Sequence, residues 1–232
     1  MECIIEGVME DISTVVQIIA NLFVIFGAIF AIYQYRKQKK LTRISNAINL
    51  AKYFASKIMD RACFVYAMFR ENDEIMSIIQ RHEGEIKNAC YFNTEEYESI
   101  FSEEERQKYK EFISSEINIS GGRTISISAV LQEAINELEH CCINFNTGIA
   151  EEKAVYQSMH QVILNLFPCA YPWIGSLNQN GVDLYYTNLC ELYQRWNQIR
   201  EKALKREAKA NRKLKKYQQN CSKIGRVKSP KI

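Results

Sequence analysis

An apolar run near the N-terminus dominates the pattern of hydrophobic and polar positions along the chain. Residues 14–33 contain no charged side chain. Five basic residues follow closely: Arg36, Lys37, Lys39, Lys40 and Arg43. Twenty helical residues extend about 30 Å, which matches the hydrocarbon core of a bilayer. The pattern therefore predicts one transmembrane helix over residues 13–35.

The charges on the two sides of this run predict its orientation. Acidic residues precede it, and the basic residues follow it. Because cytoplasmic flanks carry an excess of Lys and Arg, we expect residues 36–232 in the cytosol and the N-terminus outside. Two alternatives are a cleaved signal peptide and a buried core helix. The acidic leader and the poor cleavage site argue against the first, and the abrupt basic stop argues against the second.

Small and polar residues share one face of the predicted span. At 100° per residue, one arc contains Gln17, Asn21, Val24, Gly27, Ala28 and Ala31. A carboxamide that faces lipid leaves hydrogen-bonding groups unsatisfied, at a cost of roughly a few kcal/mol. The spacing Gly27-x-x-x-Ala31 lets helix backbones pack closely. We therefore expect copies of the span to associate into a homo-oligomer through Gly27 and Ala31. A narrow path would then be lined by Gln17, Asn21, Val24 and Ala28. A simple anchor with two incidental polar residues is the alternative.

The leader, residues 1–12, has an amphipathic pattern. Its apolar residues share a helical face, and acidic residues recur every four positions opposite. This pattern predicts a short extracytoplasmic helix that covers the mouth of the bundle. A frayed terminus is the alternative.

Helical patterns fill residues 36–194, the expected cytosolic domain. Apolar residues keep a 3.6-residue period from Ile44 to Phe69 without Gly or Pro, so the span is expected to continue into this helix or to bend at the basic cluster. Capping signals at Asn72, Thr94 and Ser102 predict three short helices.

Three further helices are expected in the second half of the domain. They cover residues 130–145, 154–167 and 184–199. Pro168 and Pro172 are expected to end the second of them, and residues 118–128 read as a loop. The fold class is therefore predicted as all-α, with one N-terminal transmembrane helix followed by a cytosolic bundle of five to seven helices.

The residue inventory argues against catalysis. The eight cysteines form no C-x-x-C pair, only three histidines are present, and no zinc-protease, serine-hydrolase, Walker A or dinucleotide motif occurs. We expect no enzymatic activity, no cofactor and no metal site. The cysteines of a cytosolic domain are expected to be reduced thiols that pack in its core.

The C-terminal segment, residues 195–232, is strongly basic. It holds 14 Lys and Arg against 2 acidic residues, a net charge of +12, so residues 1–194 carry −9 of the chain's total of +3. The candidate ligand-binding residues are Arg195, Arg200, Lys202, Lys205, Arg206, Lys209, Arg212 and Lys213. Such a helix attracts a polyanion such as nucleic acid, and an anionic lipid surface is an equally physical partner. Tyr193 and Trp196 fit either base stacking or the core. A solvated, frayed terminus is the remaining alternative.

Two stretches carry a resemblance to known proteins. They are residues 136–149 (NELEHCCINFNTGI) and residues 185–196 (YYTNLCELYxxW). They resemble a family of uncharacterised bacterial proteins with one N-terminal membrane helix and a helical cytosolic domain. Within that setting the chain resembles the membrane effector of Hailong-type two-gene anti-phage systems.

This resemblance implies a homo-oligomeric ion channel in the bacterial inner membrane. Short deoxyadenylate strands, made by a nucleotidyltransferase partner, would hold the channel closed, and loss of that ligand would open it and depolarise the cell. The alternative is a membrane-tethered helical scaffold that recruits a protein partner without conducting ions. A membrane-bound hydrolase is a third possibility, which the missing nucleophile and metal motifs disfavour.

Overall fold

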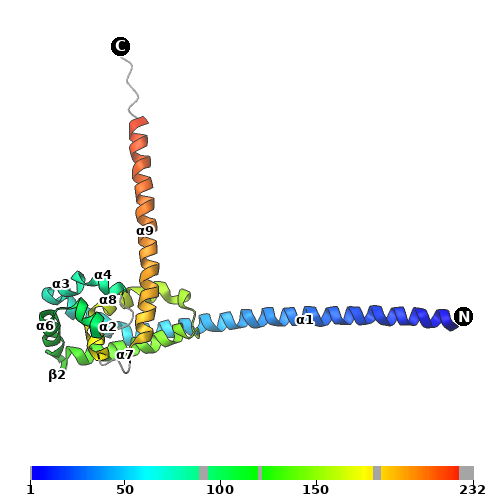
Figure 1. The fold of residues 1–232 in the computed structure, drawn as a ribbon, viewed down its shortest axis with the longest axis horizontal. Helices are drawn as coiled ribbons and strands as arrows, with labels where there is room; N and C mark the ends of the chain where they lie inside the picture. The colour runs from blue at the N-terminus through cyan, green and yellow to red at the C-terminus, as the bar shows by residue number, and fades with distance from the viewer. Residues whose placement is uncertain (1, 89–93, 120–121, 180–183, 225–232) are drawn as a thin grey trace, which may run out of the picture.

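The computed structural model describes the backbone of residues 2–88, 94–119, 122–179 and 184–224 (Figure 1). Almost all of these residues are helical. One long apolar N-terminal helix is followed by a helical domain, so the predicted all-α class is confirmed.

The first helix, α1 (Glu2–Tyr53), runs without a break from the leader through the apolar run into the domain. It continues through a π-helical turn, η1 (Phe54–Ile58), into α2 (Met59–Arg70). Of the two expected possibilities, continuation beyond the basic cluster is the one found. The wider turn of a π-helix leaves both Phe54 and Ile58 buried in the core.

Three long helices form the centre of the domain with α2. They are α7 (Ile127–Asn146), α8 (Glu152–Asn178) and α9 (Thr187–Ile224). Aromatic side chains fill the space between them. The rings of Phe167 and Tyr193 stack with centroids 4.1 Å apart. The ring centroids of Trp196 and Phe145 lie 6.1 Å apart. Burying each large apolar side chain contributes about 1.5–3 kcal/mol to folding, so this cluster anchors α9 in the domain.

Four shorter helices cover one side of this core: α3 (Asp73–Arg81), α4 (Glu83–Asn88), α5 (Thr94–Ile100) and α6 (Glu103–Ser114). The predicted caps at Asn72 and Ser102 are confirmed, and the predicted start at Thr94 agrees with the first residue of α5, whose side chain lies outside those described. The side chain of Asn72 accepts a hydrogen bond from Ile75 N at 3.0 Å. Ser102 and Glu105 form the full capping box, in which each side chain accepts from the other's backbone N–H.

The prediction that Pro168 and Pro172 end a helix is wrong. Helix α8 runs through both residues to Asn178. Each proline removes one backbone donor, at a cost of about 3 kcal/mol in a helix interior. The segment around them is buried on every side, from Ile163 to Ile174 with only Asn165 exposed. The free energy gained by burying this segment outweighs the tendency of proline to end a helix.

The prediction of a loop over residues 118–128 is also wrong. Strands β1 (Glu116–Ile119) and β2 (Arg123–Ser126) form an antiparallel hairpin in which Ile117 lies opposite Ile125. Gly122, directly before β2, has φ +72°, a conformation that glycine adopts readily. Ile117 and Ile125 pack against the core, and this tertiary contact favours the strands.

Two helices extend beyond the packed domain. In Figure 1 the blue N-terminal part of α1 leaves it in one direction, and the orange-to-red part of α9 leaves it crosswise to α1. Packing on α1 begins at Arg43, which pairs with Glu151, and packing on α9 extends to Arg200, which lies 3.8 Å from Glu83. The predicted domain boundaries at residues 12, 35 and 194 lie inside continuous helices and stay predictions.

Candidate functional site

The apolar part of α1 has no partner within the described chain. Every side chain from Gln17 to Thr42 is exposed, including Phe23 at 73% and Phe26 at 65%. In the described residues, α1 with its continuation is the one helical stretch long and apolar enough to cross a membrane. Residues 17–35 alone extend about 28 Å. Exposing a surface this apolar to water is unfavourable, so the helix is a candidate for crossing a membrane.

The predicted pore-lining residues lie on one continuous face of this helix. Gln17, Asn21, Val24 and Ala28 are all exposed, and none is covered by the domain. Gly27 has open space around the position of a Cβ atom, and Ala31 follows one turn later on the same side. The face is therefore free to meet another helix. The side chains of the leader, residues 1–12, lie outside those that the structure describes.

The eight predicted ligand-binding cations divide into two groups. Arg195 donates to Glu152 Oε2 at 3.1 Å and to Asn146 Oδ1 at 2.6 Å, and Arg200 donates to Asn197 Oδ1 at 3.0 Å. These two residues are therefore engaged within the domain. The other six are exposed on α9 beyond the domain: Lys202, Lys205, Arg206, Lys209, Arg212 and Lys213. We call residues 202–217 of α9 the basic arm.

The two aromatic residues before the basic arm belong to the core. Tyr193 and Trp196 are fully buried. Of the two alternatives from the sequence, base stacking and packing in the core, packing in the core is therefore correct for both residues. The Trp196 indole N–H donates to Glu152 Oε1 at 2.6 Å. Tyr217, in contrast, is 75% exposed at the end of the described arm.

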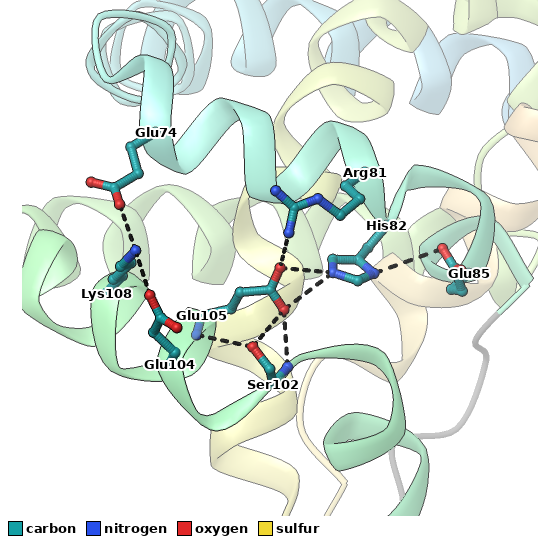
Figure 2. A network of polar contacts seen from close by, with 8 residues as sticks. All are labelled: Glu74, Arg81, His82, Glu85, Ser102, Glu104, Glu105 and Lys108. Carbon is teal, nitrogen blue, oxygen red and sulfur yellow. Dashed lines mark hydrogen bonds and ion pairs between the residues drawn. The ribbon is translucent and has the colours of Figure 1, made fainter.

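A network of charged residues that the sequence did not reveal joins α3 to α6. Figure 2 shows the Glu105 carboxylate between Arg81, His82 and Ser102, and the contact to Arg81 Nη1 is 2.7 Å long. Burial raises the pKa of the Glu105 carboxyl, but hydrogen bonds from Ser102 and His82 outweigh it and hold the pKa below its ordinary value. The spacing Ser102-x-x-Glu105 predicts the hydrogen bond to Ser102. The contacts of Glu105 with Arg81 and His82 form because α3 packs against α6, which the sequence pattern does not show.

A polar cleft opens between α5, α6 and the C-terminal part of α8. Its volume is about 650 Å³, and Tyr97, Arg106 and Trp173 are among its lining residues. The Arg106 guanidinium lies 5.7 Å from the centre of the Tyr97 ring and pairs with Glu98 at 3.3 Å. The charge of Arg106 is thus already compensated within the described residues.

Burial suppresses the reactivity of most described cysteines. Cys141, Cys142, Cys169 and Cys190 are buried, and Cys63 is an exposed free thiol. Burial raises the pKa of Cys141 and of Cys169 to about 12, so both stay protonated near neutral pH. In the described part of the chain, no three His, Cys, Asp or Glu side chains come together as metal ligands.

The comparisons with known proteins assign a family. No curated protein and no solved structure matches the chain. A family model matches residues 21–196, which include part of the apolar helix and end where α9 leaves the domain. The chain therefore belongs to the family described as Domain of unknown function (DUF4760).

Proposed function

We propose that this protein is an oligomeric membrane effector, an ion channel whose single span lines the conducting path and whose helical domain gates it. The observation that carries this proposal is the continuity of α1. One unbroken helix bears both the polar face at Gln17 and Asn21 and the contacts that fix it in the domain.

Self-association follows from the chemistry of the span. Gln17 and Asn21 stack one turn apart on α1 and are exposed. In lipid, their carboxamides gain hydrogen bonds only from other polar groups or from water. A bundle of several copies brings these amides together, and the small residues Gly27 and Ala31 allow the backbones to approach.

Gating through the domain follows from the base of α1. The backbone O of Arg43 accepts a hydrogen bond from Glu151 N at 2.9 Å, and Asn46 Nδ2 donates to Ile149 O at 3.1 Å. Ala47 is fully buried. Because residues 28–53 of the helix contain no Gly or Pro, rotation of the domain turns the adjoining part of the span with it.

The proposed membrane location and the proposed ligand are inferred from the sequence. The basic flank at residues 36–43 supports a cytoplasmic domain and an outward N-terminus in a bacterial inner membrane. The resemblance to Hailong-type effectors supports a role in anti-phage defence. It also supports an anionic nucleotide or oligonucleotide ligand made by a nucleotidyltransferase partner. The sequence predicts this ligand at the basic C-terminal segment, where anionic lipid is the competing partner for the exposed cations.

Conductance of the purified full-length protein in planar bilayers tests the proposal. The wild type is expected to conduct, and Asn21→Leu is expected to change the conductance because it removes an amide from the path. Phe26→Leu, on the opposite side of the helix, is the matched control and is expected to leave conductance unchanged. Absence of current from the wild type would favour the scaffold, and equal effects of the two variants would exclude a path lined by Asn21.

A further inference from the structure

Seven cations of the basic arm lie on one face of α9. At 100° per residue they fall within an arc of about 120°. They are Lys202, Lys205, Arg206, Lys209, Arg212, Lys213 and Lys216. All seven are exposed, and among the described side chains none of them pairs with a carboxylate. Lys215 is the one described cation of the arm outside this arc, about 120° from its centre.

Arg195 shows where this face lies relative to the rest of the molecule. It precedes Lys202 by seven residues, two helical turns, so it lies on the same face of α9. Arg195 pairs with Glu152, and the adjacent Glu151 pairs with Arg43 at 3.1 Å. The cationic face is therefore the side of α9 that is turned toward the base of the projecting part of α1.

The arm also lies within reach of the membrane that α1 would cross. Eight residues, or about 12 Å of helix, separate Tyr35 from Arg43. The arm runs crosswise to α1 (Figure 1). Its tip at Tyr217 lies about 33 Å along α9 from Arg195. A tilt of about 20°, which is average for membrane helices, lowers that tip by roughly 11 Å toward the headgroups.

We propose that the basic arm binds the surface of the same membrane, with its cationic face on anionic lipid headgroups. This inference rests on the membrane anchoring in the proposed function and adds a second attachment point to each subunit. The arm has no packing partner in the described chain, and a helix of this length is marginally stable alone in water. Anionic lipid supplies the opposite charge over a flat surface that a one-sided row of cations fits.

Lipid is favoured over nucleic acid by this one-sided placement. The cationic face is directed toward the membrane-proximal end of the domain through Arg195, Glu152 and Glu151. In addition, two of the three aromatic residues that flank the arm, Tyr193 and Trp196, are buried in the core, which leaves Tyr217 as the exposed ring for stacking on a base. An anchored protein also holds its arm near lipid permanently, which raises the effective concentration of that partner.

Amide hydrogen exchange of the full-length protein in nanodiscs tests the proposal. Exchange of residues 202–217 is compared in phosphatidylcholine alone and in a mixture with phosphatidylglycerol. Slower exchange is expected in the anionic discs, and this protection should disappear at about 1 M salt, where the Debye length is about 3 Å. Protection of residues 17–35 in the same data reports the anchoring itself.

A matched pair of variants separates the face from the total charge. Lys209→Gln removes a cation from the face and is expected to reduce the arm's protection about fivefold, whereas Lys215→Gln is expected to leave it unchanged. Both substitutions keep a good helix former.

Equal exchange in the two lipids, or protection that requires added short oligodeoxyadenylate, would overturn the lipid assignment. Equal effects of the two variants would overturn it as well. Conductance recorded from the same preparation is a separate readout, so a failed channel is distinguishable from a failed arm.

Discussion

The guanidinium of Arg195 lies 3.1 Å from the carboxylate of Glu152, so the first cation of the basic segment is held against the start of α8. The other oxygen of Glu152 accepts the indole N–H of Trp196 at 2.6 Å. One carboxylate thus fixes two consecutive residues of α9 at the point where the helix leaves the domain. The direction of the basic arm depends on this contact.

Replacing Glu152 with Ala is expected to destabilise the domain by about 1–3 kcal/mol, because the buried Trp196 donor loses its acceptor. Guanidinium unfolding followed by tryptophan fluorescence measures this change, since both tryptophans lie in the domain. Glu133→Ala is the control. It removes an exposed ion pair with Arg61 and is expected to cost less than about 1 kcal/mol. Equal losses would contradict the role given to Glu152.

Replacing Gly175 with Ala is expected to destabilise the protein by about 1–3 kcal/mol through overpacking. A Cβ atom at this position would lie 2.4 Å from Cδ2 of Tyr97. Tyr97 is buried between α5 and α8 and has little room to move. Gly84→Ala, with open space around the new methyl, is expected to be neutral or stabilising by up to about 1 kcal/mol. Thermal unfolding of the two variants compares them, and a harmless Gly175→Ala would refute the close contact.

The Glu105 network predicts a dependence of stability on acid pH. The pKa of the Glu105 carboxyl in the folded protein is lowered relative to 4.5. The contribution of this carboxylate to the free energy of unfolding is therefore complete above pH 4.5 and is lost as the pH falls through the lower folded-state pKa. Glu105→Gln is therefore expected to be less stable than the wild type at neutral pH and to show a smaller loss on acidification. Denaturation series at several pH values measure this.

Glu104→Gln is the control for the Glu105 experiment. Glu104 lies on the same helix and pairs with Lys108 at the surface, where solvent screens the interaction. A pH profile that Glu105→Gln leaves unaltered would show that the network does not act through this carboxylate.

Replacing Gly27 with Leu is expected to weaken self-association of the span, because a bulky side chain keeps the helices apart. Light scattering of the detergent-solubilised protein would then report a smaller assembly than for the wild type. Leu22→Phe enlarges a side chain on the opposite side of α1 and is expected to preserve the assembly. A wild type that is strictly monomeric would remove the basis for the channel.

Much of the architecture was predictable because local signals decide it. The apolar run, the caps at Asn72 and Ser102 and the uninterrupted period of the long helices each depend on residues close in sequence. For the candidate site, the sequence predicted the face with Gln17 and Asn21 and the basic helix, since both follow from helical periodicity. It also predicted the all-α class, because Gly and Pro are scarce.

The remaining features depend on contacts between residues far apart in the chain. Burial of α8 on all sides carries it through Pro168 and Pro172, against their local preference. Packing of Ile117 and Ile125 against the core favours strands in a segment whose sequence pattern predicts a loop. The pairing of Arg195 with Glu152, 43 residues apart, sets where α9 leaves the domain. The sequence by itself determined most of the helical segments and where charge accumulates. The tertiary structure decided how far α8 extends, which charges are paired and in which direction the unpaired ones lie. The physical reason is that periodicity acts within one helix, while pairing and direction arise only where helices pack together.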